Sequence, residues 1–233
     1  MAWPWMTWKS LTAEEQERRL GKWRRDMVRR QIERRGVRDP AVLAALRSVP
    51  RHRFLPPALW RHAYRDRPLP IGHSQTISQP YIVALMTEAL HVAAGDRILE
   101  IGTGSGYQAA VLTELGCEVF TIEILEPLAQ RARQALEALG YASVRVRRGD
   151  GYGGWPEAAP FDAIILTAAP RRVPPLLAGQ LKTGGRMVLP LGDEVQDLCV
   201  CLRTPRGLAH ELILHVRFVP MTGRAADEWA QPS

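Results

Sequence analysis

The stretch "LEIGTGSGYQ", residues 99–108, decides the fold. A short apolar run leads into three closely spaced glycines, and a helical pattern follows over "YQAAVLTEL". Glycine permits a tight turn from a strand into a helix and lets backbone N–H groups approach a ligand closely. Gly102, Gly104 and Gly106 therefore predict a ligand-binding turn at the carboxyl end of a parallel sheet.

Strands and helices alternate after Asp96. The expected strands cover residues 97–101, 118–123, 144–148, 161–167 and 186–191, and the expected helices cover 107–115, 127–139 and 174–181. Helical segments between strands imply parallel pairing through right-handed crossovers. The runs 197–203 and 212–220 lie too close together for a crossover helix and should form an antiparallel pair at the edge. The fold class is an α/β, doubly wound, mostly parallel Rossmann-like sheet with an antiparallel edge.

Residues 1–95 have a different pattern, typical of a tail and a helical cap. Thr12 and Glu15 have the spacing of a capping box, for a helix that runs toward Gly36. Asp39 and Pro40 then begin a second helix. The segment 51–70 holds four prolines and is expected to be an irregular connection over the surface, and the tryptophan-rich first ten residues a loosely held tail. We expect 1–95 to contribute a substrate loop and 96–233 to form the cofactor-binding core of one integrated domain.

Composition limits the class of protein. A chain of 233 residues with 46% hydrophobic content suits one well-buried domain. Apolar stretches are interrupted before the roughly 18 residues of a membrane span, and the first ten residues lack a secretory signal, so we expect a cytoplasmic protein without a membrane partner. Cys117, Cys199 and Cys201 have no metal-ligand spacing, which indicates reduced, buried thiols and no metal site.

The net charge of +7 raises the hypothesis of nucleic-acid binding. Positive charge is densest in residues 17–38, where Leu20, Trp23, Met27 and Ile32 recur near helical spacing and arginines fill the other side. Acidic residues are interspersed there. A solvated helix face is therefore favoured over a nucleic-acid arm, and no nucleic-acid partner is expected.

The surroundings of the glycine turn indicate the ligand. Tyr107 stands where a dinucleotide fold would place its next glycine and fits a pyrophosphate poorly. Glu123 ends the second strand, 17 residues after Gly106, where a carboxylate can accept hydrogen bonds from both hydroxyls of a ribose. Glu100, just before the glycines, would repel a pyrophosphate but suits a cationic ligand. A ribose combined with a cationic centre indicates S-adenosylmethionine.

The segment "GDG", residues 149–151, follows the third strand. Asp150 there can accept a hydrogen bond from the adenine amino group. The alternative is a turn-forming Asp-Gly pair, which is equally compatible with these residues taken alone. Together with the glycine turn and Glu123, the segment favours S-adenosylmethionine as the cofactor.

Six segments together resemble a known family. They are "LPIGHSQTISQPYIVALMTEAL", "ILEIGTGSGYQ", "GDGYGGW", "PFDAIILTAAP", "LKTGGRMVLPLG" and "VRFVPM", and the resemblance covers about residues 27–222. They are similar to the signature segments of the bacterial protein-L-isoaspartate O-methyltransferases. The resemblance implies a Rossmann-like methyltransferase that methylates the free α-carboxylate of L-isoaspartyl residues in damaged proteins and peptides. The ester then closes to a succinimide, which begins repair.

The resemblance also implies residue roles. Ser78 is similar to the family's active-site serine, which holds one oxygen of the substrate carboxylate, and Thr76 and Ile77 form the adjoining wall. Val219 lies in "VRFVP", which resembles the segment that pairs with the substrate peptide as an added strand. The residues expected at the cofactor are Glu100, Gly102, Thr103, Gly104, Ser105, Gly106, Glu123, Asp150, Gly151 and Thr222. We expect a monomer that acts on isoaspartyl-containing proteins and peptides.

Alternatives remain at this stage. Ser78 could simply N-cap the helix that follows it. The cofactor turn alone also fits a methyltransferase for RNA or a small molecule, which would carry an aromatic-rich or proline-tyrosine motif where "TAAP", residues 167–170, stands. A binding module without activity is disfavoured by the intact glycine turn. His73 has no orienting carboxylate beside it and is expected to be solvated.

Overall fold

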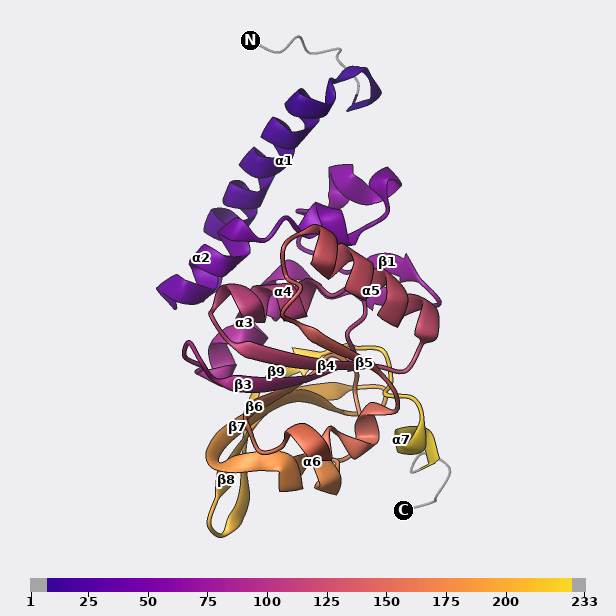
Figure 1. Cartoon of the computed structure of the whole chain (residues 1–233). Coiled ribbons are helices and arrows are strands. Elements are labelled where there is room, and N and C mark those ends of the chain that lie inside the picture. Colours follow the sequence, from indigo (N-terminus) through magenta and orange to yellow (C-terminus); the bar gives the residue numbers. More distant parts are fainter. Residues whose placement is uncertain (1–7, 228–233) are drawn as a thin grey trace.

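The computed structural model describes residues 8–227, which form a seven-stranded sheet and a two-stranded hairpin. The strand order of the large sheet is β5-β4-β3-β6-β7-β8-β9 (Figure 1). Strands β3 to β7 pair in parallel, and β8 and β9 add an antiparallel edge, as the sequence predicts. The strand bounds are β3 Arg97–Ile101, β4 Glu118–Glu123, β5 Arg145–Arg148, β6 Phe161–Leu166, β7 Leu181–Gly192, β8 Gln196–Thr204 and β9 Gly207–Val216.

Helices cover both faces of this sheet (Figure 1). Alternate residues of β3 point to opposite sides: Ile98 packs in the core that includes α4 and α5, whereas Leu99 and Ile101 pack with Leu177 of α6. A strand buried on both faces requires an almost continuous apolar run, which is why the sequence signal here is strong. The helix bounds are α3 Pro80–Leu90, α4 Tyr107–Glu114, α5 Glu126–Ala138, α6 Pro175–Gln180 and α7 Arg224–Asp227, with 3-10 turns η6 Gly151–Gly153 and η7 Pro156–Ala158.

The N-terminal helices follow the predicted caps. Thr12 and Glu15 form a complete capping box at the start of α1 (Ala13–Met27). The helix continues through a π turn, η2 (Val28–Ile32), and a 3-10 turn, η3 (Glu33–Arg35), and ends at Gly36 with φ +103°. Asp39 N-caps α2 (Pro40–Ser48) as predicted. Figure 1 shows α1 extending away from the sheet.

The segment 51–70 has the irregular backbone that was predicted, but the prediction that it runs over the surface is wrong for the part that is buried. It forms the 3-10 turns η4 (Arg51–Phe54) and η5 (Pro57–His62) and begins a hairpin, and Arg51 and His52 are fully buried. Nε of Arg51 donates to the carbonyl of Ala63 at 2.8 Å, and its guanidinium lies 5.0 Å from the ring centroid of Tyr107. Burial lowers the pKa of Arg51 to about 10, so it stays charged at neutral pH. The prolines in this segment predict an irregular backbone, but they do not predict whether the segment is buried.

A tight hairpin leads into the predicted substrate loop. Strands β1 (Leu69–Gly72) and β2 (Gln75–Ile77) pair antiparallel around His73 and Ser74. Both turn residues have positive φ, 52° and 57°, as a two-residue type I′ turn requires. The hairpin buries Ile77 and leaves Thr76 exposed, and it fixes where the chain enters α3.

Of the three tryptophans in the predicted tail, Trp8 lies within the described residues. Trp3 and Trp5 lie outside the described residues. Trp8, in the 3-10 turn η1 (Trp8–Ser10), stacks on Trp23 of α1 with ring centroids 5.6 Å apart.

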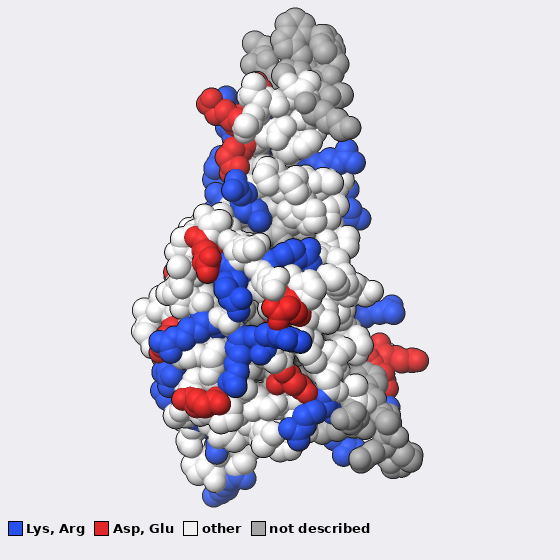
Figure 2. All heavy atoms as spheres, turned by 45° about the vertical axis from the view of Figure 1, so that its right-hand side comes forward, with Lys and Arg blue, Asp and Glu red and all other residues white. Residues whose placement is uncertain are grey.

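The face shown in Figure 2 carries both signs of charge, with acidic side chains between the basic ones. Glu118 contacts both Arg97 and Arg145 at 3.0 Å, and Arg147 and Arg148 each contact a glutamate at the same distance. Several of the protein's arginines are thus balanced locally by carboxylates. Within residues 8–227, no helix combines the length and hydrophobicity that crossing a bilayer would need.

The three cysteines are unbonded and buried, as predicted. Burial raises the pKa of Cys117 and of Cys201 to about 12. Both thiols therefore stay protonated at neutral pH, which makes them poor nucleophiles.

A carboxylate joins the N-terminal helices to the sheet-packing helix α3. Glu88 of α3 accepts the backbone N–H groups of Arg38 and Asp39 at 2.6 and 2.7 Å. One hydrophobic core also includes Leu46 of α2 together with Ile98 of β3. Glu88 therefore ties the start of α2 to α3 within residues 1–95, and the shared apolar core anchors the described part of this segment on the sheet.

We expect Glu88→Ala to lower the free energy of unfolding by about 1.5 kcal/mol, the lower end for hydrogen bonds to a charged group, because Glu88 is only partly buried. Urea denaturation of the variant and wild type measures it. Glu137→Ala, the same change at an exposed site on α5, is the control and should change stability by less than about 0.5 kcal/mol. Equal stability of the two variants would contradict the anchoring role.

Candidate active site

The candidate site is a cavity at the carboxyl ends of β3, β4 and β6. The chain runs from β3 to β4 and β5 on one side and returns to β6 on the other, so β3 and β6 border the point where the strand order reverses. Open α/β sheets bind ligands at such a point. All predicted cofactor and substrate residues line this cavity except Gly106 and Asp150: Thr76, Ile77, Ser78, Glu100, Gly102, Thr103, Gly104, Ser105, Glu123, Gly151, Val219 and Thr222.

The first glycine permits a close approach of two strand ends. Gly102 has φ +95°, and a Cβ there would lie 2.4 Å from Oγ1 of Thr167, which follows β6. That hydroxyl donates to the carbonyl of Gly102 at 2.6 Å. Gly106 has a packing role in this structure, and its contact with the cofactor stays a prediction. It lies outside the cavity lining, and a Cβ there would meet Leu136 of α5 at 3.2 Å, so it allows α4 to pack on α5.

Glu123 holds the glycine turn from the end of β4. Its Oε2 accepts the N–H of Gly104 at 2.8 Å, and its Oε1 accepts the N–H of Leu125 at 3.0 Å. The side chain is buried yet borders the cavity. A carboxylate fixed by two backbone donors is preorganised, and each oxygen keeps acceptor capacity for a ligand hydroxyl.

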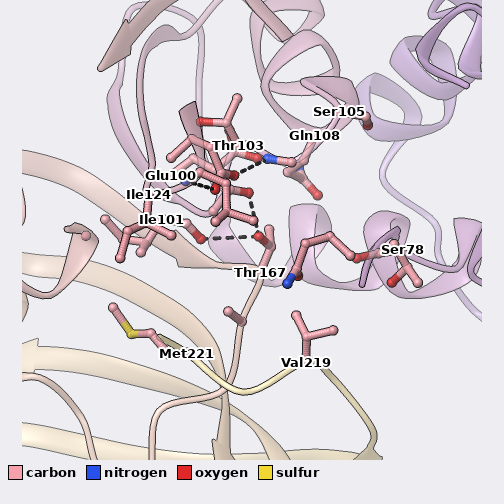
Figure 3. A pocket seen from close by; sticks show the side chains of 18 of the residues that line it. Ser78, Glu100, Ile101, Thr103, Ser105, Gln108, Ile124, Thr167, Val219 and Met221 are labelled. Atoms are coloured by element: carbon pink, nitrogen blue, oxygen red, sulfur yellow. Dashed lines mark hydrogen bonds between the residues drawn. The ribbon is translucent and has the colours of Figure 1, made fainter. Parts of the chain in front are cut away.

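Glu100 is a fully buried carboxyl group in the cavity wall. Oγ1 of Thr121, its neighbour on β4, donates to Oε2 at 2.6 Å and is itself 2.6 Å from Oγ1 of Thr103. Oε1 has no hydrogen-bond partner among the described residues (Figure 3). Burial raises the pKa of Glu100 to about 8, and the nearby Glu123 adds to the rise. A cationic ligand in the cavity would favour the ionised form.

Asp150 has a capping role in this structure. Its Oδ1 accepts the N–H of Tyr152 at 2.9 Å, and its Oδ2 accepts the N–H of Arg224 at 2.8 Å. It lies outside the cavity lining, whereas the adjacent Gly151 is part of it. The turn-forming alternative is thus what the structure shows, and the contact to adenine stays a prediction.

Ser78 is not the N-cap of α3, so that alternative is wrong. The N-cap is Gln79, and no side chain caps the helix. The hydroxyl of Ser78 makes no hydrogen bond within the described residues. Ser78 faces the cavity from the opposite side to Glu100 and Thr103 (Figure 3).

A second cavity, the outer groove, meets the first at Ser78. Both cavities are lined by Thr76, Ser78, Thr167 and Val219. The remaining lining residues of the outer groove are Arg35, Pro68, Gln79, Tyr81, Ile82 and residues 214–218. Two ligands, one in each cavity, would therefore both contact these four residues, which we call the shared wall.

The predicted added strand along "VRFVP" is restricted by the backbone hydrogen bonds. The amide of Gln196 accepts the N–H of Phe218 at 2.6 Å and donates to its carbonyl at 3.1 Å. The carbonyl of Val219 accepts the N–H of Ala169 at 2.9 Å. The N–H and the carbonyl of Phe218 are therefore both occupied within the protein. Strand pairing with a substrate peptide stays a prediction for the residues on either side of Phe218.

Thr167 and Gln108 are among the lining residues that the sequence did not predict. Thr167 joins the shared wall, and Gln108 of α4 donates to Oγ1 of Thr87 at 2.9 Å behind the cavity. The position of Thr167, directly after a buried strand at the reversal point, is a signal that could have found it. Nothing in the sequence around Gln108 distinguishes it. His73 lines the cavity as an exposed turn residue.

Comparison with known proteins identifies the family. The profile of the protein-L-isoaspartate(D-aspartate) O-methyltransferase family matches residues 22–226. The chain belongs to this family. It is 58% identical to the protein-L-isoaspartate O-methyltransferase of Gloeobacter violaceus over 204 residues, which are 87% of this chain and 100% of the relative. The enzyme of the same name from Opitutus terrae is 57% identical over 201 residues, 85% of this chain and 86% of that one.

Solved structures share the fold. A protein-L-isoaspartate O-methyltransferase superposes with a TM-score of 0.78 at 30% identity, covering 86% of this chain and 67% of that one. A Plasmodium falciparum structure, described as a putative protein-L-isoaspartate O-methyltransferase in complex with S-adenosyl-L-homocysteine, gives a TM-score of 0.74 at 22% identity, covering 85% and 98%. A protein-L-isoaspartate O-methyltransferase thus has the same mixed sheet.

Replacing Glu100 tests its raised pKa. Well below pH 4.5 the Glu100 carboxyl group is neutral in both the folded and the unfolded chain. As the pH rises toward 8, this group ionises in the unfolded chain but stays largely neutral in the folded one. The unfolded state is thereby favoured, and the free energy of unfolding of wild type falls. The free energy of unfolding of Glu100→Gln minus that of wild type should therefore increase from pH 5 to pH 8. Urea titrations at several pH values measure it, with the exposed Glu137→Gln as the control that stays flat. A flat difference for Glu100→Gln would contradict the shift.

Proposed function

We propose that this chain carries out its family's reaction, S-adenosylmethionine-dependent methylation of the free α-carboxylate of L-isoaspartyl residues, at the wall shared by the two cavities. The observation that carries the proposal is that Thr76, Ser78, Thr167 and Val219 line both cavities. The inner cavity would hold the cofactor and the outer groove the damaged peptide. A carboxylate held beside these four residues would then lie next to the methyl donor, and its methyl ester would lead to the succinimide from which repair begins.

The inner cavity fits the cofactor. Glu123 is fixed by two backbone donors and can accept from ribose hydroxyls, and Glu100 presents a buried oxygen without a partner. An ionised Glu100 would also favour positive charge, because an opposite charge stabilises a buried carboxylate. When bound, S-adenosylmethionine supplies a methyl group on a positively charged sulfur.

The substrate carboxylate needs no general base. A carboxyl group with an ordinary pKa of about 3.9 is already ionised at neutral pH. Catalysis is then mainly positioning, and the correct orientation of two reactants can lower a barrier by roughly 7–11 kcal/mol. The residues of the shared wall should therefore act by holding the carboxylate, not by moving a proton.

Ser78 is the residue that we assign to this task. Its hydroxyl is uncommitted, since it neither caps α3 nor bonds to another described residue. A hydroxyl can donate to one carboxylate oxygen and leave the other free to react. The β1–β2 hairpin on one side and α3 on the other fix its backbone, so the donor is placed before the substrate arrives.

Selectivity should also come from geometry. An isoaspartyl linkage differs from an aspartyl one by moving one methylene into the main chain, and pocket filling alone distinguishes a methylene by only ~1–3 kcal/mol. With the peptide in the outer groove and the carboxylate at Ser78, only the isomerised linkage should bring an oxygen to the methyl donor. We therefore expect near-absolute discrimination.

The substrate assignment is tested with two peptides that differ only in L-isoaspartate or L-aspartate at one position. Radiolabelled methyl transfer should occur to the first and be undetectable with the second, because the normal linkage holds its carboxylate out of line. Scintillation counting of both reactions measures it. Equal labelling of both peptides, or labelling of RNA alone, would overturn the proposed function.

The role of Ser78 is tested by Ser78→Ala. Losing a hydrogen bond to a charged group should lower kcat/KM on the isoaspartyl peptide by about 10- to 100-fold. The free energy of unfolding and the cofactor affinity should stay close to those of wild type, because Ser78 caps nothing. Kinetics, urea denaturation and calorimetry on the same samples decide it. The exposed Ser48→Ala on α2 is the control. Full activity of Ser78→Ala would remove Ser78 from the mechanism.

A further inference from the structure

The outer groove is unusually basic for a surface that must accept a peptide. Its cavity volume is ≈ 570 Å³, against ≈ 240 Å³ for the inner cavity, so it has room for residues on either side of the isoaspartate. Three basic side chains line it, Arg35, His215 and Arg217, and within residues 8–227 no aspartate or glutamate does. The groove therefore favours negative charge in what it binds.

Two of these three side chains already have acidic partners. Arg35 contacts Asp66 at 2.6 Å, and its guanidinium stacks on the ring of Tyr81 at 3.4 Å from the centroid. Nδ1 of His215 lies 2.7 Å from Oδ1 of Asp197 on the neighbouring strand β8. Each therefore already has a carboxylate partner on the protein, and Arg35 is also held in place by the aromatic ring.

Arg217 is different. It follows the last residue of β9 and is exposed, and no carboxylate in the described part of the chain contacts it. It lines the outer groove but not the inner cavity, so its charge would lie beside a peptide bound in the groove and apart from the cofactor. A guanidinium presents several N–H donors in a plane that matches a carboxylate.

We propose that Arg217 is a specificity-determining residue that recognises a second carboxylate of the substrate peptide. This inference rests on the proposed function. The carboxylate belongs to an aspartate or glutamate close to the isoaspartate or to the C-terminus of the peptide, and the same guanidinium chemistry serves both.

The reach of Arg217 limits which position it reads. Val219, two residues along the chain, belongs to the wall where the reacting carboxylate is held. An extended chain advances roughly 3.3–3.6 Å per residue, so two residues cover about 7 Å. The recognised carboxylate should therefore lie within about three residues of the isoaspartate.

The test uses one isoaspartyl peptide that is amidated at its C-terminus and has no charge other than the isoaspartyl carboxylate. Glutamine occupies each of the three positions on either side of the isoaspartate. Each glutamine is replaced singly by glutamate, and in a further peptide the amide is replaced by a free C-terminal carboxylate. The kcat/KM ratio of each acidic peptide to the uncharged one is measured for wild type, Arg217→Gln and Arg206→Gln. Arg206 is an exposed arginine before the other end of β9 and lies outside the groove lining, so its replacement removes the same charge elsewhere.

Wild type should favour at least one acidic peptide by about three- to fivefold, the size expected for an exposed ion pair, mainly through KM. The preference should shrink in 0.5 M salt because mobile ions screen the pair. Arg217→Gln should bring the ratio close to one, and Arg206→Gln should keep it. Preference for a peptide with a flanking glutamate would identify an acidic side chain as the recognised carboxylate. Preference for the peptide with a free C-terminus would identify the terminal carboxylate.

The inference is overturned if wild type shows no preference at any position, or if the preference survives in Arg217→Gln. An equal loss in Arg206→Gln also overturns it, because the effect would then come from net charge. Absence of methylation on every isoaspartyl peptide, including the uncharged one, would instead disprove the proposed function, so the two failures are distinguishable.

Discussion

The hydrogen bond from the N–H of Gly104 to Glu123 is the contact on which the site depends. It joins the turn after β3 to the end of β4, and the hydroxyl of Thr167 joins the same turn to the end of β6. Three parallel strands are thereby tied together at their carboxyl ends. The apolar core fixes the strands relative to one another, but these few polar bonds shape the backbone into a surface for a ligand.

The same arrangement explains why the inner cavity is acidic although the protein carries an excess of positive charge. Glu100 and Glu123 lie on adjacent strands, and both are buried. Ionising both groups in the interior would be costly, and the raised pKa of Glu100 reflects that cost. Most arginines lie outside, where several pair with surface carboxylates. A cationic methyl donor and an anionic acceptor would thus meet wall groups of opposite character on the two sides of Ser78.

Local patterns in the sequence were sufficient for most of the fold. The capping box at Thr12 and the buried run at residues 97–101 each depend on neighbours in the chain, and both were predicted. The features that the sequence did not predict depend on distant residues. The burial of Arg51 requires the ring of Tyr107, and the packing role of Gly106 requires Leu136. The assignment of Ser78 to the site followed from resemblance, whereas its freedom from capping could be seen only once α3 was placed.

The contact between Gly106 and Leu136 has a consequence for how the sequence can change. A Cβ at position 106 would meet the Leu136 side chain at 3.2 Å, and the glycine also has φ +88°. Because α4 begins directly after this glycine, any displacement of α4 from α5 would move the turn that Glu123 holds. Positions 106 and 136 therefore form a size-matched pair. Among related chains, glycine should be retained at position 106, because a smaller residue at position 136 would relieve the contact but not the backbone strain.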